Sequence, residues 1–138
     1  MKKIYSLLLL VISCTSFGQT IYSENFGTPT GTTPIATYAT GTAPATFQNT
    51  TPIVYSGTAD VRVTGVSSGY SGFSGGGNIF ITNTAGRYFQ IDGINTSTLA
   101  NKTNLQLSFG LNATATVQPI VEFSTDASAT TPTWTPVT

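Results

Sequence analysis

The stretch Leu105-Gln106-Leu107-Ser108-Phe109-Gly110-Leu111 carries the clearest structural signal in this chain of 138 residues. Its odd-numbered residues are large and apolar, and the residues between them are small or polar. Side chains of a β-strand point alternately to opposite faces of the sheet. The stretch therefore predicts an antiparallel strand of a β-sandwich, with one buried face and one solvated face.

Similar short runs recur along residues 19–138, separated by clusters of Gly, Asn, Pro and Thr. Further strands are expected at Ile21–Phe26, Ala45–Gln48, Ile53–Tyr55, Ala59–Val66, Asn78–Thr82, Arg87–Asp92, Val117–Phe123 and Thr133–Val137. Residues 28–52 are rich in Thr, Ala, Pro and Gly, and we expect a largely irregular excursion with one short strand there. Because no sustained helical periodicity is present, the sequence predicts an all-β fold, a jelly-roll-like antiparallel β-sandwich.

The first 18 residues have the features of an export signal. Lys2 and Lys3 precede the apolar run Ile4–Ile12, which is too short to span a bilayer but suits the apolar region of a signal peptide. We expect residues 1–18 to be removed and residues 19–138 to form one secreted or extracellular β-sandwich module. The mature chain is expected to have no transmembrane segment.

The residues around the expected cleavage site leave two kinds of signal open. Ser16 and Gly18 place small side chains where a signal peptidase needs them, directly before Gln19. This pattern predicts an ordinary secreted protein. The alternative is a lipoprotein anchored through Cys14, because residues 11–14 fit a loose lipobox.

Composition excludes several classes of chemistry for this chain. It has five basic and five acidic residues, no His and one Cys. Without a basic face to neutralise phosphates, we expect no nucleic-acid partner. The usual zinc ligand sets and the Ser-His-Asp or Cys-His catalytic arrangements cannot be assembled from these residues. Small polar side chains, among them 27 Thr and 13 Ser, solvate the surface instead of charges.

Several segments resemble, in the same order, the N-terminal jelly-roll-like β-sandwich modules of secreted Bacteroidetes proteins. These segments are Ile21–Gly27, Gly75–Ile81, Tyr88–Ser97, Leu105–Gly110 and Val121–Asp126, followed by Trp134. The resemblance implies a carbohydrate-binding-like sandwich that precedes other domains and a C-terminal type IX secretion sorting domain. Where that family usually has Asp-Gly before its Trp, this chain has Asp126-Ala127 and a longer Ser/Thr segment.

The end of the chain agrees with a module at the front of a longer protein. The predicted strand Thr133–Val137 is the last segment, and a sandwich needs both sheets completed before its edges are protected. We therefore expect the sandwich to be incomplete at its C-terminus.

Two aromatic residues are the candidate ligand-binding residues. Tyr70 and Phe73 lie in the Gly-rich segment 69–77, which lacks the Gly-Lys-Ser/Thr of a phosphate-binding loop. Aromatic rings exposed on a loop can stack on sugar faces, so both residues are candidates for binding a glycan. The alternative is that these rings pack back onto the core.

The resemblance also implies a structural calcium ion near the first strand. Calcium binds carboxylate and amide oxygens, which makes Glu24 and Asn25 the candidate metal ligands; the alternative is a solvated strand end. We expect no catalytic residues. A glycosidase needs two carboxylates across a cleft, whereas Glu122 lies within a predicted strand and Asp92 and Asp126 lie in turn contexts.

These observations predict a non-catalytic, secreted or cell-surface module that binds glycan or mediates adhesion. One alternative is an accessory N-terminal module of a secreted hydrolase, a nuclease or glycan-active enzyme, whose catalytic domain lies beyond residue 138. A second alternative is a structural spacer on the cell surface.

Overall fold

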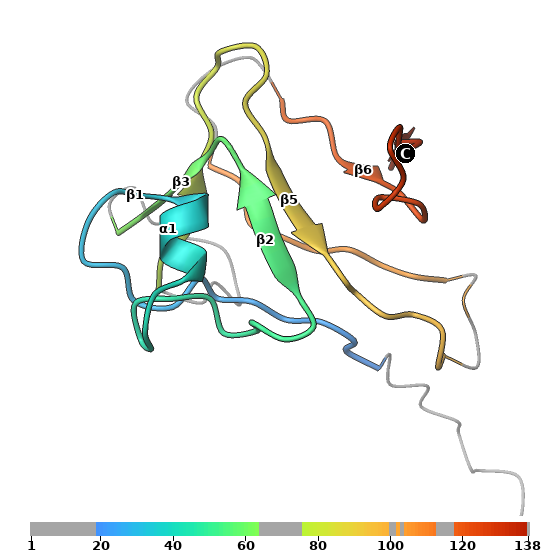
Figure 1. The fold of residues 1–138 in the computed structure, drawn as a ribbon, viewed down its shortest axis with the longest axis horizontal. Helices are drawn as coiled ribbons and strands as arrows, with labels where there is room; N and C mark the ends of the chain where they lie inside the picture. The colour runs from blue at the N-terminus through green and yellow to red at the C-terminus, as the bar shows by residue number, and fades with distance from the viewer. Residues whose placement is uncertain (1–18, 64–75, 100–101, 103, 113–117, 138) are drawn as a thin grey trace, which may run out of the picture.

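The computed structural model describes residues 19–63, 76–99, 102, 104–112 and 118–137. The expected signal peptide, Cys14, Tyr70 and Phe73 lie outside these residues. In the described parts the chain forms mostly short strands and little helix (Figure 1). The elements are β1 Thr33–Pro34, α1 Ile35–Ala39, β2 Val54–Gly57, β3 Asp60–Arg62, β4 Asn78–Phe80, β5 Phe89–Asp92, β6 Glu122–Phe123 and β7 Thr135–Pro136.

The strands form three small antiparallel sheets. The first has the order β1-β3-β4, in which Val61 pairs with Thr33 on one side and Ile79 on the other. The second joins β2 to β5, with Tyr55 opposite Ile91. The third joins β6 to β7, which lie apart from α1, β2 and β5 in Figure 1. The antiparallel all-β prediction agrees with this arrangement, whereas the sheets are smaller than those of the predicted sandwich.

The core lies between α1 and the first two sheets. The helix packs against β2 and also contacts β1 and β3 (Figure 1). The buried apolar side chains are Ile35, Tyr38, Phe47, Ile53, Tyr55, Ala59 and Val61. Three of these side chains are aromatic and contact one another. The ring of Phe47 stacks on Tyr55 with 3.8 Å between centroids and meets Tyr38 edge to face at 5.1 Å.

Residues 28–52 contain more structure than the sequence predicted, because α1 and β1 both lie within this range. Ile35 and Tyr38 are three residues apart, so they share one face of the helix, and both are buried. A helix of five residues is unstable alone and depends on such packing. The helix therefore forms because two of its side chains pack on the core. Five residues are too few to show a helical periodicity in the sequence, so the helix was not predicted.

Four predicted strands are confirmed with shifted or shorter bounds. The runs Ile53–Tyr55, Ala59–Val66, Asn78–Thr82 and Arg87–Asp92 correspond to β2, β3, β4 and β5. The runs Val117–Phe123 and Thr133–Val137 contain only the two-residue strands β6 and β7. Residues 64–66 and 117 of these runs lie outside the described residues.

The predicted strands Ile21–Phe26 and Ala45–Gln48 are wrong, because neither segment forms a ladder. Phe26 and Gly27 have positive φ angles of 62° and 58°, which end any extended run. The backbone N–H groups of this region instead donate to side chains. Asn25 N donates to Gln48 Oε1, and Gly27 N donates to Asn25 Oδ1. Such local bonds compete with strand pairing.

The predicted strand over 105–111 is also wrong, although its alternation is the clearest in the sequence. Residues 105–111 belong to none of the strands in the described parts of the chain, and their apolar side chains are exposed, Leu107 at 60% and Phe109 at 57%. An apolar face is buried only when another element covers it, and none of the described elements covers this one. The alternation shows that one face of residues 105–111 is apolar, but it does not show which element would cover that face.

The contrast between Phe47 and Phe109 yields a stability prediction. Phe47 is 1% exposed, so Phe47→Ala is expected to reduce the free energy of unfolding by about 3–5 kcal/mol. Phe109→Ala, the matched exposed variant, is expected to change it by less than about 0.5 kcal/mol. Urea unfolding followed by circular dichroism measures both values. A Phe109→Ala loss as large as that of Phe47→Ala would mean that residues 105–111 are buried in solution.

Candidate functional site

The carboxylate of Glu24 is the centre of a dense hydrogen-bond network. Oε1 accepts from the backbone N–H of Phe26 at 2.7 Å. Oε2 accepts from the backbone N–H groups of Gln48 at 2.9 Å and Asn49 at 3.3 Å, and from the Tyr55 hydroxyl at 2.8 Å. Glu24 thus joins the N-terminal segment to the segment before β2 and to β2 itself. Hydrogen bonds to an ionised group are stronger than those between neutral groups.

A chain of hydroxyl groups extends this network to Tyr22. The hydroxyl oxygens of Tyr22 and Tyr55 lie 3.2 Å apart. Because a hydroxyl has one hydrogen and Tyr55 donates it to Glu24, Tyr22 donates to the oxygen of Tyr55. Burial raises the pKa of the Tyr55 hydroxyl, and its donation to the Glu24 carboxylate raises it further. Burial likewise raises the pKa of Tyr22, so both hydroxyls remain neutral donors.

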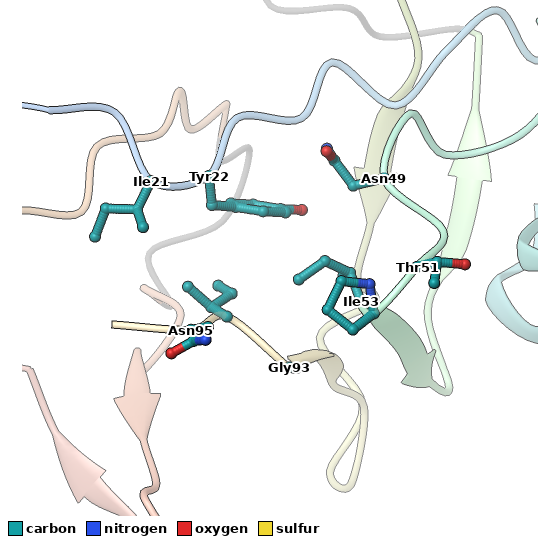
Figure 2. Close-up of a pocket in the computed structure, with 9 residues that line it drawn as sticks. Ile21, Tyr22, Asn49, Thr51, Ile53, Gly93 and Asn95 are labelled. Atoms are coloured by element: carbon teal, nitrogen blue, oxygen red, sulfur yellow. The ribbon is translucent and has the colours of Figure 1, made fainter. Parts of the chain in front are cut away.

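A pocket of about 200 Å³ opens beside the Tyr22 ring (Figure 2). It is lined by residues from three parts of the chain: the N-terminal segment, the segment before β2 and the residues just after β5. They include Ile21, Tyr22, Asn49, Thr51, Ile53 and Asn95. Figure 2 shows the Tyr22 ring edge-on, with Asn49 on one side of it and Asn95 on the other. None of the nine lining residues carries a charge.

The amide groups of this pocket are oriented by the fold. Asn49 Nδ2 donates to the carbonyl oxygen of Ser23 at 2.6 Å, which directs the amide nitrogen toward the protein. Asn95 Oδ1 accepts from the backbone N–H of Ser97 at 2.8 Å, which directs the amide oxygen toward the protein. Asn49 therefore has its amide oxygen available for further contacts, and Asn95 has its NH₂ group available.

A second pocket, of about 450 Å³, is lined by residues of the N-terminal segment and of the segment before β2, and by Gly76. Its lining includes Asn25, Gly27, Pro44, Phe47 and Gln48, and it also contains no charged residue. Its aromatic residue, Phe47, is buried within the ring cluster. The second pocket therefore presents backbone and small polar groups, with no exposed ring.

The predicted calcium ligands are both engaged by donors. Glu24 receives N–H and O–H groups on its carboxylate, and Asn25 Oδ1 accepts from Gly27 N at 2.9 Å. A cation requires oxygen ligands, whereas these N–H groups direct positive partial charge toward the carboxylate. Among the described residues no group of three or more His, Cys, Asp or Glu could hold a metal ion. In this structure the Glu24 carboxylate accepts hydrogen bonds from the backbone of the chain itself.

Two other carboxylates have local partners. Asp92 accepts from Gln90 Nε2 at 2.8 Å, within β5. Asp126 accepts from the Ser124 hydroxyl at 2.6 Å and from the backbone N–H of Thr133 at 2.9 Å. These bonds, that of Ser124 first, lower the pKa of Asp126. Asp126 begins a turn, as its sequence context predicted, whereas Asp92 lies within β5 and not in the predicted turn.

The pocket residues were not predicted as a site from the sequence. Tyr22, Asn49 and Asn95 lie in segments that the sequence presented as strand or loop, and they meet only through the folding of the chain. One signal was available: Tyr22 and Glu24 are two residues apart, a spacing that puts them on the same face of an extended segment. The predicted ligand-binding residues Tyr70 and Phe73 lie outside the described residues.

No protein-family model, no curated protein and no solved structure matches this chain. Its function is therefore inferred from the geometry of the described residues. The described residues contain no helix that could span a bilayer.

The Glu24 network predicts a specific loss of stability on neutralising one side chain. Glu24→Gln replaces one acceptor oxygen with an NH₂ group that faces N–H donors, and is expected to reduce the free energy of unfolding by about 1.5–3 kcal/mol. Glu122→Gln, at an exposed position of β6, is the matched control and is expected to change it by less than about 0.5 kcal/mol. Thermal unfolding with and without millimolar Ca²⁺ completes the test. Stabilisation of the wild type by Ca²⁺, absent in Glu24→Gln, would instead identify Glu24 as a metal ligand.

The raised tyrosine pKa values predict a stability loss at alkaline pH. Burial raises the pKa of Tyr22, Tyr38 and Tyr55 above the ordinary value of 10.0. A group whose pKa is higher in the folded state stabilises the fold fully below its unfolded pKa, and this contribution disappears as the pH rises above 10. Ultraviolet absorbance should show these residues forming tyrosinate together with unfolding followed by circular dichroism. Ionisation of Tyr22, Tyr38 and Tyr55 near pH 10 with the fold intact, identified by the absorbance lost in their Phe variants, would contradict the buried hydroxyl chain.

Proposed function

We propose that this chain is a non-catalytic, exported β-module that binds neutral glycans at the cell exterior. The observation that carries the proposal is the uncharged lining of both pockets beside the Glu24 network. A neutral polar ligand needs hydrogen-bonding groups and apolar surface without a counter-charge, and these pockets offer that combination.

The carboxylates support a binding role over a catalytic one. Glycoside hydrolysis by the common mechanism needs two carboxylates facing each other across a cleft. Glu24, Asp92 and Asp126 accept hydrogen bonds from neighbouring donors, and none of them lines either pocket. The proposed module therefore holds a ligand without transforming it.

A jelly-roll-like sandwich is the architecture we propose for the whole module. Two small antiparallel sheets contribute to one core, β2 through Tyr55 and β3 through Val61. Two sheets enclosing a shared core is the arrangement of a sandwich. The likeness of the N-terminal segments to secreted Bacteroidetes modules, and the basic and apolar residues 1–12, support export of this module.

A glycan array tests the proposal directly. The chain, expressed with its own N-terminal segment and collected after export, is expected to bind neutral oligosaccharides and to leave them uncleaved. Mass spectrometry of the recovered glycans measures cleavage in the same experiment. Failure to bind any neutral glycan would overturn the proposal and favour a surface spacer, and cleavage of a bound glycan would replace the module by a hydrolase.

A further inference from the structure

We infer that the pocket beside Tyr22 binds a single neutral sugar ring, with the Tyr22 ring as its stacking platform and Asn49 and Asn95 as its polar contacts. This inference rests on the proposed function and names the site and the part of the ligand that it recognises. It differs from the sequence-based prediction, which placed the aromatic contacts at Tyr70 and Phe73.

The size of the pocket limits its ligand to one ring. Its volume of about 200 Å³ is below the roughly 300–1,000 Å³ of pockets that enclose a drug-sized ligand. A sugar ring within a glycan, whose neighbours extend into solvent, fits such a shallow site. The remainder of the glycan chain would run over the exposed Ile94 and Asn95 at the rim.

Tyr22 is held in place before any ligand arrives. Its hydroxyl donates to Tyr55, which donates to Glu24, so the polar end of the side chain is anchored on the protein side. The ring is half-buried and packs against the core cluster, and in Figure 2 one of its faces is turned toward Asn95. The negative face of an aromatic ring attracts the weakly positive C–H groups of a sugar. A ring that is already ordered loses little further entropy on binding.

The polar rim matches the hydroxyl groups of a sugar. Asn49 has its amide nitrogen bonded to Ser23, so its oxygen is the group available to accept. Asn95 has its oxygen bonded to Ser97, so its NH₂ is available to donate. Each sugar hydroxyl can donate one hydrogen bond and accept others. Asn49 can accept from such a hydroxyl and Asn95 can donate to one, on opposite sides of the Tyr22 ring.

The charges around the pocket favour neutral glycans over acidic ones. No lining residue offers a cation to a uronate, sulfate or sialate group. The carboxylate of Glu24 lies at the hydroxyl end of the Tyr22–Tyr55 chain and repels an anion. Acidic glycans are therefore expected to bind this pocket less tightly than neutral ones.

Isothermal titration calorimetry with single oligosaccharides tests the site. The probes are cellohexaose, maltohexaose, xylohexaose and mannohexaose, with oligogalacturonate as the acidic comparison. For the best neutral probe, Tyr22→Ala is expected to weaken binding at least about tenfold, whereas Tyr22→Phe, which keeps the ring, is expected to stay within about threefold. Tyr88→Ala removes an exposed ring outside the pocket and is expected to leave affinity unchanged.

Circular dichroism shows whether Tyr22→Ala folds. If it does not fold, a second variant tests the site. Ile94→Arg places a long side chain at the pocket from an exposed position, and is expected to abolish binding without loss of structure. Ile81→Arg, at an equally exposed position away from the pocket, is the control and is expected to bind normally. Wild-type affinity in a folded Ile94→Arg variant would overturn the site and leave the proposed function intact. Absence of binding by the wild type to every neutral probe would overturn the proposed function itself.

Discussion

The acceptance of N–H and O–H donors by the Glu24 carboxylate is the interaction on which the arrangement of this chain depends. It joins three segments that no β-ladder joins among the described residues: the N-terminal segment, residues 48–49 and β2. Backbone N–H groups that are not paired in a sheet need another acceptor when they are removed from water. One carboxylate provides it for Phe26, Gln48 and Asn49, and thereby lets irregular backbone pack on the aromatic core.

The aromatic cluster and the pocket follow from this arrangement. With the segment before β2 held by Glu24, Phe47 reaches the core and stacks on Tyr55. The hydroxyl of Tyr55 then has Glu24 on one side and Tyr22 on the other. The same contacts that fill the core therefore position the Tyr22 ring at the surface. Stability and the proposed binding site share their hydrogen bonds, so variants of Glu24 are expected to affect both.

Strands were predicted correctly where two strands pair through their backbones, and wrongly where side chains accept the backbone N–H groups or no described element covers the apolar face. Residues 53–55 are β-branched or aromatic and residues 89–92 alternate, and β2 and β5 pair there. Residues 21–26 were also predicted as a strand, yet Glu24 and Asn25 accept the backbone N–H groups that a ladder would use. Residues 105–111 alternate most clearly, but alternation contains no information about which element covers the apolar face.

The sequence by itself determined the chemical limits of this protein: no His, one Cys, ten charges and a surface supplied by Thr, Ser and Asn. It also determined the strand-rich character, because alternation and turn residues act locally. Only the tertiary structure decided that α1 forms, that Glu24 binds backbone rather than solvent, and that Tyr22, Asn49 and Asn95 line one pocket. These features depend on contacts between residues distant in the chain, and local preferences do not specify which distant residues meet.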